Sequence, residues 1–242
     1  MPFPNVGIIE ISIGSNKVSY ALASYTSNMV EMFMAVTEFT KQAEKILRSP
    51  VHFNWEILCI FGLIIYVYAT EIEHKRYDTV LAGVALWLAD WFNELINTAV
   101  LHVTHHAALW TVTGDTSYLI LIGISIEISL YFLIDGIIFV KLLPKSTSMK
   151  IAGIPNRIVY VVGASILSTG AELILRQIGI LHWGYWWWNV PMVIILGYCP
   201  LYGIAAWVHD NGSNRSKQLI ILGSIAGIDA ILAVIFGFAG WL

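Results

Sequence analysis

Residues 79–106 of this chain read TVLAGVALWLADWFNELINTAVLHVTHH, an apolar run that is long enough to cross a bilayer. Acidic and amide side chains interrupt it at helical spacing, namely Asp90, Asn93, Glu94 and Asn97. An acidic residue at the centre of a membrane helix costs about 2.5 to 3.5 kcal/mol on insertion scales. The stretch therefore predicts a transmembrane helix whose acidic residues serve a function.

The composition of the whole chain supports a membrane location. Hydrophobic residues make up 57% of the 242 residues and charged residues 12%, and the mean hydropathy is +0.73. These values exclude a soluble domain with a charged surface. The net charge of -3, without a run of Lys or Arg, argues against nucleic acid as a partner. We expect an integral protein of the cell inner membrane or an equivalent membrane, in contact with the lipid bilayer. The sequence leaves open whether the protein forms a homo- or hetero-oligomer.

Six apolar stretches predict an all-α, polytopic bundle of about six transmembrane helices. Each stretch is bounded by charged residues, Pro, Gly or Asn, and together they are 53–70, 79–102, 118–143, 157–180, 190–208 and 218–241. Residues 1–50 are mixed in character and are interpreted as an N-terminal amphipathic, interfacial segment. Residues 51–242 form the transmembrane domain. A seventh crossing over residues 20–39 stays open.

The distribution of basic residues predicts the orientation of the bundle. The connections that contain residues 102–117 and 182–189 carry no Lys or Arg. The other connections carry the basic residues Lys75, Arg76, Lys145, Lys150, Arg157, Arg215 and Lys217. By the positive-inside rule, the His-rich and Trp-rich connections are therefore expected on the non-cytoplasmic side.

The segment that begins at Glu94 is echoed by the segment that begins at Glu172. Both read Glu-Leu-Ile, followed by Leu-His, a Trp and an apolar run with a Gly. Both copies point the same way through the membrane, so the pattern indicates a parallel internal repeat. In such a repeat, Glu94 and Glu172 are counterparts that face a shared interior.

The acidic residues are the first candidates for catalysis. Asp90, Glu94 and Asn97 share one face of a helix at about 100° per residue. Two carboxylates one turn apart repel each other when both are ionised, so one keeps its proton or both share a cation. Asp90 and Glu94 therefore suit a general acid or base, with Glu172 as the opposing carboxylate. The alternatives are hydrogen bonds between helices and, for Glu172, local pairing with Arg176.

Three histidines follow the same helix in the pattern His102-Val-Thr-His105-His106. If the helix continues through them, they lie on one side, near the face of Asp90 and Glu94. Imidazole and carboxylate groups are ligands for Fe, Zn or Cu. The pattern resembles the HxxHH box of membrane fatty-acid desaturases and hydroxylases, which implies a metal-dependent oxidoreductase. The alternative is a set of polar, pH-sensitive side chains at the membrane interface.

Residues 182–189 read HWGYWWWN, the densest aromatic run of the chain. Such a run is typical of the aromatic belt at a membrane interface. It also suits an apolar wall whose ring faces attract a cation. On the second interpretation, Trp183, Tyr185 and Trp187 bind a hydrophobic substrate together with Asn97.

A second resemblance joins these acidic and aromatic residues. The spacing of Glu172, Gly179, Trp183, Tyr185, Pro191, Gly197 and Pro200 resembles that of integral-membrane carotenoid enzymes of the lycopene-cyclase and bisanhydrobacterioruberin-hydratase type. The resemblance implies an isoprenoid substrate and catalysis by carboxylic acids. The chain carries Ile126-Glu127-Ile128 where that family carries a Pro-Glu-Glu element.

The leading hypothesis is therefore a membrane-embedded enzyme that acts on an isoprenoid or lipid-like substrate through intramembrane carboxylates. A metal-dependent hydroxylase or desaturase is the second hypothesis. A proton- or cation-coupled transporter, in which the same carboxylates form a relay, and a subunit of a larger membrane complex both stay open.

Overall fold

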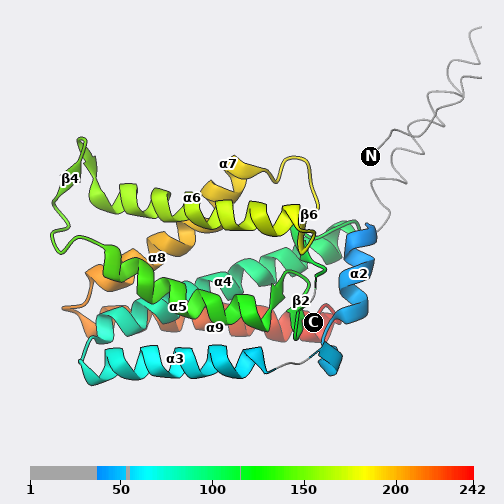
Figure 1. The fold of residues 1–242 in the computed structure, drawn as a ribbon, viewed down its shortest axis with the longest axis horizontal. Helices are drawn as coiled ribbons and strands as arrows, with labels where there is room; N and C mark the ends of the chain where they lie inside the picture. Colours follow the sequence, from blue (N-terminus) through cyan, green and yellow to red (C-terminus); the bar gives the residue numbers. More distant parts are fainter. Residues whose placement is uncertain (1–36, 53–54, 115) are drawn as a thin grey trace, which may run out of the picture. The chain divides into compact units, whose positions relative to one another are not determined.

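The computed structural model describes residues 37–52, 55–114 and 116–242 (Figure 1). The long helices are α3 (Glu56–Glu73), α4 (Tyr77–Thr104), α5 (Ile126–Leu142), α6 (Asn156–Gln177) and α9 (Arg215–Ala239). Another helix is continuous but irregular and consists of α7 (Val190–Met192), the π-helical turn η2 (Val193–Tyr198) and α8 (Cys199–Asp210). The short helices α2 (Glu38–Ile46) and η1 (Pro50–His52) precede them.

In the described part of the chain, three short antiparallel strand pairs connect the helices. Strand β1 (Trp110–Val112) pairs with β6 (Leu181–Trp183), which lies far away in the sequence. The other two pairs are local hairpins, β2 (Leu119–Leu121) with β3 (Ile124–Ser125) and β4 (Lys150–Ile151) with β5 (Ile154–Pro155). The β1–β6 ladder ties the connection after α4 to the connection after α6.

Four of the described helical segments are long and apolar enough to cross a membrane. They are Tyr77–Thr104, Asn156–Gln177, Val190–Asp210 and Arg215–Ala239. Each of the six predicted stretches contains a helix, but α3 and α5 do not meet this criterion, so the predicted count of six or seven crossings is not confirmed. The proposed crossing over residues 20–39 lies almost entirely outside the described residues, and the interfacial placement of residues 1–50 stays a prediction.

Helix α5 is shorter than the predicted span 118–143. Residues 119–125 of that span form the β2–β3 hairpin instead. The helix begins only after Ser125, whose side chain accepts a hydrogen bond from the backbone N–H of Ile128. A Ser at this position satisfies one of the free N–H groups at a helix start. The hairpin thereby brings Gly123 against Glu94 and Asn97 of α4.

Helix α4 is the centre of the bundle and packs against α3, α5, α8 and α9. Its small residues allow this, because Ala82, Ala85 and Ala89 are buried in the largest apolar cluster. The backbones of α4 and α5 approach closely where Gly83 faces Gly136, since a Cβ added at Gly136 would lie 2.8 Å from Gly83 Cα. Small residues permit such close helix contacts in membrane proteins.

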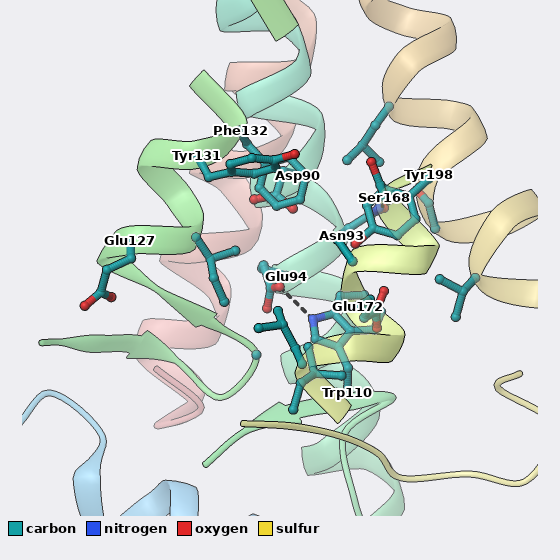
Figure 2. A pocket seen from close by; sticks show the side chains of 18 of the residues that line it. Asp90, Asn93, Glu94, Trp110, Glu127, Tyr131, Phe132, Ser168, Glu172 and Tyr198 are labelled. Carbon is teal, nitrogen blue, oxygen red and sulfur yellow. Dashed lines mark hydrogen bonds between the residues drawn. The ribbon is translucent and has the colours of Figure 1, made fainter. Parts of the chain in front are cut away.

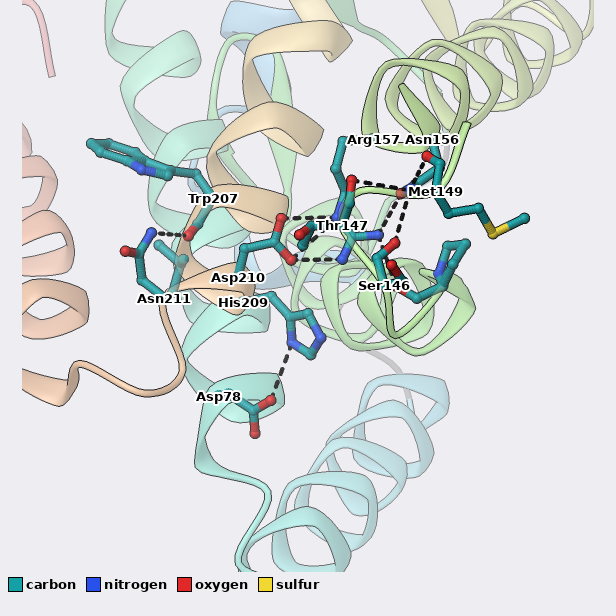
Figure 3. Close-up of polar contacts among 12 residues, drawn as sticks. Asp78, Ser146, Thr147, Met149, Asn156, Arg157, Trp207, His209, Asp210 and Asn211 are labelled. Atoms are coloured by element: carbon teal, nitrogen blue, oxygen red, sulfur yellow. Dashed lines mark hydrogen bonds and ion pairs between the residues drawn. The ribbon is translucent and has the colours of Figure 1, made fainter. Parts of the chain in front are cut away.

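Polar side chains join the helix ends at the end of the bundle that carries β4 (Figures 1 and 3). Arg157 at the start of α6 binds Asp210 at the end of α8, with Nη2 and Oδ1 2.7 Å apart. His209 Nδ1 lies 3.4 Å from Asp78 Oδ2 at the start of α4. The buried Asn156 donates hydrogen bonds to backbone carbonyl groups of the α5–α6 connection. The opposite end carries the β1–β6 ladder.

Candidate functional site

A cavity of about 490 Å³ lies between α4, α5, α6 and the η2–α8 segment, next to the β1–β6 ladder (Figure 2). Its lining includes four acidic residues, Asp90, Glu94, Glu127 and Glu172. The aromatic residues in the lining are Trp110, Tyr131, Phe132, Trp188 and Tyr198. None of the described residues that line it is Lys, Arg or His. The cavity is therefore acidic and aromatic.

Helix α4 supplies the first two carboxyl groups, one turn apart. The side chains of Asp90 and Glu94 are buried, with 4% and 2% of their surface exposed. Asp90 Oδ2 and Glu94 Oε2 have no hydrogen-bond partner among the described residues. A buried oxygen without a partner costs free energy, and two such groups side by side cannot both stay ionised without a cation. One carboxyl group of the pair is therefore expected to keep its proton, and each group has one oxygen that can contact a molecule in the cavity.

Trp110 fixes the other oxygen of Glu94. Its indole Nε1 donates to Glu94 Oε1 over 2.7 Å (Figure 2). Asn97 holds the backbone of Trp110, donating from Nδ2 to its carbonyl oxygen over 2.8 Å and accepting from its N–H over 3.2 Å. Asn97 was predicted to bind substrate directly, but it is fully buried and absent from the described lining. It positions Trp110 instead.

Glu172 on α6 has an equivalent arrangement. The indole Nε1 of Trp183 donates to Glu172 Oε1 over 2.6 Å, and the Tyr198 hydroxyl also interacts with this carboxyl group. The predicted local partner Arg176 takes another position, with its guanidinium group 3.9 Å from the ring centroid of Trp183. Glu172 therefore faces the cavity, and the described ion pairs do not include one between Glu172 and Arg176.

The two indole–carboxylate pairs are related through the strand ladder. In the antiparallel pairing of β1 with β6, Trp110 stands opposite Trp183. Each Trp reaches back to the Glu of the helix that precedes its own strand. The structure thus brings Asp90, Glu94 and Glu172 to one cavity, while their catalytic roles stay a prediction. The internal repeat itself stays a prediction.

The three histidines do not join the carboxylates. Helix α4 ends at Thr104, and His105 follows in the left-handed region with a φ of 52°, so the helix does not carry the histidines onto one side. The His102 ring stacks on Trp241 with ring centroids 5.3 Å apart, and His106 lies edge-on to Tyr185. Within residues 37–52, 55–114 and 116–242, no three His, Cys, Asp or Glu side chains converge as metal ligands.

The predicted Fe, Zn or Cu site of His102, His105, His106, Asp90 and Glu94 is therefore not assembled, because α4 ends at Thr104 and the rings of His102 and His106 pack on Trp241 and Tyr185 instead. The similarity to the HxxHH box is therefore one of sequence alone. The described residues do not form the set of metal ligands that the hydroxylase or desaturase hypothesis requires.

The aromatic wall is made of different residues from those predicted. Trp183, Tyr185 and Trp187 are absent from the described lining. Tyr185 donates its hydroxyl to Thr104 Oγ1 over 2.8 Å. Trp188 lines the cavity instead and stacks on Trp110, with ring centroids 5.5 Å apart. The sequence run of aromatic residues does not reveal which ring points inward, because it lies in a loop without helical or strand periodicity.

Tyr198 was also missed, and its position depends on a helix irregularity. It ends the π-helical turn η2, where Asn93 Nδ2 of α4 donates to the carbonyl oxygen of Gly197 over 3.1 Å. Single π-helical turns within α-helices are frequent at functional sites. The irregular turn places Tyr198 in the cavity wall (Figure 2). Pro200 just after it was the sequence signal for a break in regular helix.

The cavity opens sideways between α5 and α6. Tyr131 of α5 and Ile174 of α6 both line it, yet 52% and 61% of their surfaces are exposed on the side of the bundle. Ala171, also in the lining, is exposed beside them. Since α6 is one of the candidate membrane spans, this rim of Tyr131, Ala171 and Ile174 lies where lipid would surround the bundle.

Comparison with known proteins gives the family but no activity. A protein of Archaeoglobus fulgidus described as uncharacterized is 41% identical over 85% of this chain and 99% of its own length. A second such protein of this organism is 38% identical over 21% of this chain and 91% of its own length. No solved structure matches the chain. None of these comparisons names a carotenoid enzyme or a desaturase. The model of an uncharacterized membrane protein family matches residues 37–238, and the chain belongs to this family.

Proposed function

We propose that the protein is a membrane-embedded enzyme that performs acid–base chemistry on a neutral, hydrophobic substrate of the isoprenoid or lipid class. The observation that carries this proposal is the convergence of Asp90, Glu94 and Glu172 on one cavity with a sideways, apolar rim. Buried acidic residues in membrane spans are retained at a cost and mark functional sites. A lipid-soluble substrate would enter from the bilayer between α5 and α6.

The arrangement suggests separate roles for the carboxyl groups. Asp90 and Glu94 lie on the same side of the cavity, and each has an oxygen without a hydrogen-bond partner among the described residues. This pair is therefore the proposed general acid. Glu172 lies on the next wall, oriented by Trp183. It is the proposed opposing carboxylate, which receives a proton or balances positive charge as it develops on the substrate.

The charge of the lining restricts the substrate. Without a described Lys, Arg or His in the cavity, a phosphate or diphosphate group would enter against four acidic residues and without a counter-charge. A neutral chain meets no such penalty. If Asp90 or Glu94 protonates a double bond, the resulting cation is attracted by the π faces of Trp110 and Trp188. The cavity therefore suits a neutral polyene better than a charged lipid.

The experiment that tests this function compares the lipids of cells that express the wild type or the Glu94→Gln variant. We expect a neutral lipid to be converted by the wild type, with a mass change that reports water addition or an unchanged mass that reports isomerisation or cyclisation. The conversion is lost in Glu94→Gln and in Asp90→Asn. The matched control is Glu73→Gln, which makes the same change at an exposed position of α3.

A different outcome would favour transport. If the lipids of the two strains are identical, while proteoliposomes show a proton or cation flux that Glu94→Gln abolishes, then the carboxylates serve as a relay for ions. That result would contradict the enzymatic proposal.

A further inference from the structure

A polar layer borders the cavity on the side away from the β1–β6 ladder, and one of its members, Ser168, also lines the cavity. It consists of Asp135 on α5, Ser168 on α6 and Tyr202 on α8. These positions are four residues from the lining residues Tyr131, Glu172 and Tyr198, respectively. Three helices thus each contribute one polar group at the same depth, in a region that is otherwise packed with apolar side chains.

The three groups form a directed chain of hydrogen bonds. The Tyr202 hydroxyl donates to Asp135 Oδ2 over 2.5 Å. Its oxygen lies 2.5 Å from Ser168 Oγ. Because Tyr202 has only one hydroxyl hydrogen, which is engaged with Asp135, the Ser168 hydroxyl donates to Tyr202. The Ser168 oxygen then has lone pairs left for a donor in the cavity, which Ser168 lines.

The surroundings isolate this chain from other polar groups. Tyr202 is buried, with 2% of its surface exposed, and the ring of Phe139 packs on it with centroids 4.8 Å apart. The phenols of Tyr131 and Tyr198 interact electrostatically with Asp135 and Tyr202, respectively. Asp135, at the far end of the chain, is only partly buried. The chain therefore connects the cavity to a carboxyl group that is only partly buried.

We propose that Ser168, Tyr202 and Asp135 form a proton relay between the cavity and Asp135. The inference rests on the proposed acid–base function, because a reaction that adds a proton from Asp90 or Glu94 needs a path by which protons leave and return. A proton that arrives on Ser168 Oγ displaces the serine proton to Tyr202, and the tyrosine proton passes to Asp135. Ser168 and Tyr202 end unchanged, and Asp135 has gained one proton.

The relay can be tested without knowing the substrate. The full chain in lipid nanodiscs is transferred from H2O to D2O, and infrared spectra follow the C=O band of the protonated carboxyl groups. Asp90→Asn and Glu94→Gln assign the band of the cavity pair. We expect Tyr202→Phe and Ser168→Ala to slow its deuteration about tenfold or more, since a positioned proton-transfer group contributes about 10²- to 10⁴-fold to a rate.

The matched control is Tyr68→Phe. Tyr68 also donates its hydroxyl within the bundle, to the backbone carbonyl of Leu133 over 3.0 Å, but it is not connected to the cavity. Deuteration at the wild-type rate in Tyr202→Phe and Ser168→Ala would overturn the relay, and so would equal slowing in Tyr68→Phe. Slowed exchange without any lipid conversion would keep the relay and reject the enzymatic function, so the two failures are distinguishable.

Discussion

Single hydrogen bonds from Trp110 and Trp183 orient Glu94 and Glu172, two of the three described glutamates that line the cavity. Each indole has one N–H, so it fixes one carboxyl oxygen and leaves the second oxygen for other partners. At Glu94 that second oxygen is unpartnered among the described residues, and at Asp90 one oxygen is also unpartnered. A catalytic acid needs a fixed orientation with a free oxygen toward the substrate. The indole pairs supply this orientation in a wall that is otherwise apolar.

Gly123 is the residue whose replacement tests this orientation. A Cβ at this position would lie 2.5 Å from Trp110 Nε1 and 2.6 Å from Glu94 Oε2. We expect Gly123→Ala to displace the pair and to lower lipid conversion about 10²-fold, the typical effect of moving a catalytic group by about 1 Å. The Gly123 φ is not in the left-handed region, so Ala is compatible with the backbone.

The control for this substitution is Gly163→Ala on α6, because a Cβ there has no neighbour within 4 Å. We expect Gly163→Ala to convert the lipid at the wild-type rate in the same assay that shows the loss in Gly123→Ala. Full activity of Gly123→Ala would show that the position of Glu94 against Trp110 is not needed.

At the scale of elements, a buried acidic residue ties α3 to α5. Glu71 has 2% of its side chain exposed, and its two oxygens lie 3.0 Å from Arg76 Nε and 2.7 Å from Lys141 Nζ. We expect Glu71→Gln to reduce the free energy of unfolding by about 1–3 kcal/mol, because the amide keeps one acceptor oxygen but removes the negative charge and turns an NH2 donor toward the other cation. Both cations are nearly half exposed and can turn to water. Thermal unfolding in detergent measures the change. Glu73→Gln, exposed on this helix, is expected to stay near the wild type.

Helix α2 docks on β6 through a stacked pair that depends on pH. The rings of Phe39 and His182 lie 3.7 Å apart. Burial lowers the pKa of His182 below its ordinary value of 6.5, with a smaller contribution from the positive charge of Arg176. The docked state therefore binds fewer protons than the undocked state. Docking is fully stable above the ordinary pKa and weakens as the pH falls below it.

Amide hydrogen exchange of α2 measures this effect. We expect its protection, corrected for the intrinsic rate, to decrease between about pH 7.5 and about pH 5.5, the range in which histidines titrate. His182→Phe keeps an aromatic partner for Phe39 and removes the titration, so its protection should not change with pH. A decrease that persists in His182→Phe would assign the effect to another group.

The elements differ in how well the sequence predicted them. Helix α4 follows its predicted span closely, because a long apolar run with polar residues on one face has only one stable arrangement in a membrane. The start of α5 was wrong, since apolar residues 119–125 suit a strand as well as a helix. The convergence of Glu94 and Glu172 was predictable from their similar contexts, whereas Trp188, Tyr198 and the polar layer depend on loop geometry and on contacts between distant helices.

At the scale of the whole molecule, the connections between the long helices differ in charge at the two ends of the bundle. The end with β4 carries Lys150 and Arg157, while the connections at the β1–β6 end, residues 102–117 and 182–189, contain no Lys or Arg. Helix α2, which packs against β1, adds Lys41 and Lys45 at that end, but it belongs to the long N-terminal flanking segment, where the positive-inside rule is weaker. By the positive-inside rule we expect the β4 end in the cytoplasm. The cavity, next to β1 and β6, then lies nearer the non-cytoplasmic leaflet.

Cysteine labelling tests this orientation. In a Cys59→Ala, Cys199→Ala background, a membrane-impermeant maleimide added to intact cells should label Trp186→Cys and leave Lys150→Cys unlabelled until the cells are opened. Both positions are exposed. The reverse pattern would invert the proposed orientation.

In the proposed function, acidic groups from α4 and α6 share one cavity that a lipid-soluble substrate enters from the bilayer. An experimental density map of the full chain in nanodiscs of native lipid is the sharpest test of this arrangement. We expect elongated density between α5 and α6 that ends beside Asp90 and Glu94, with Glu172 on the neighbouring wall. A map in which side chains fill this space, and in which Asp90, Glu94 and Glu172 point apart toward separate local partners, would contradict it.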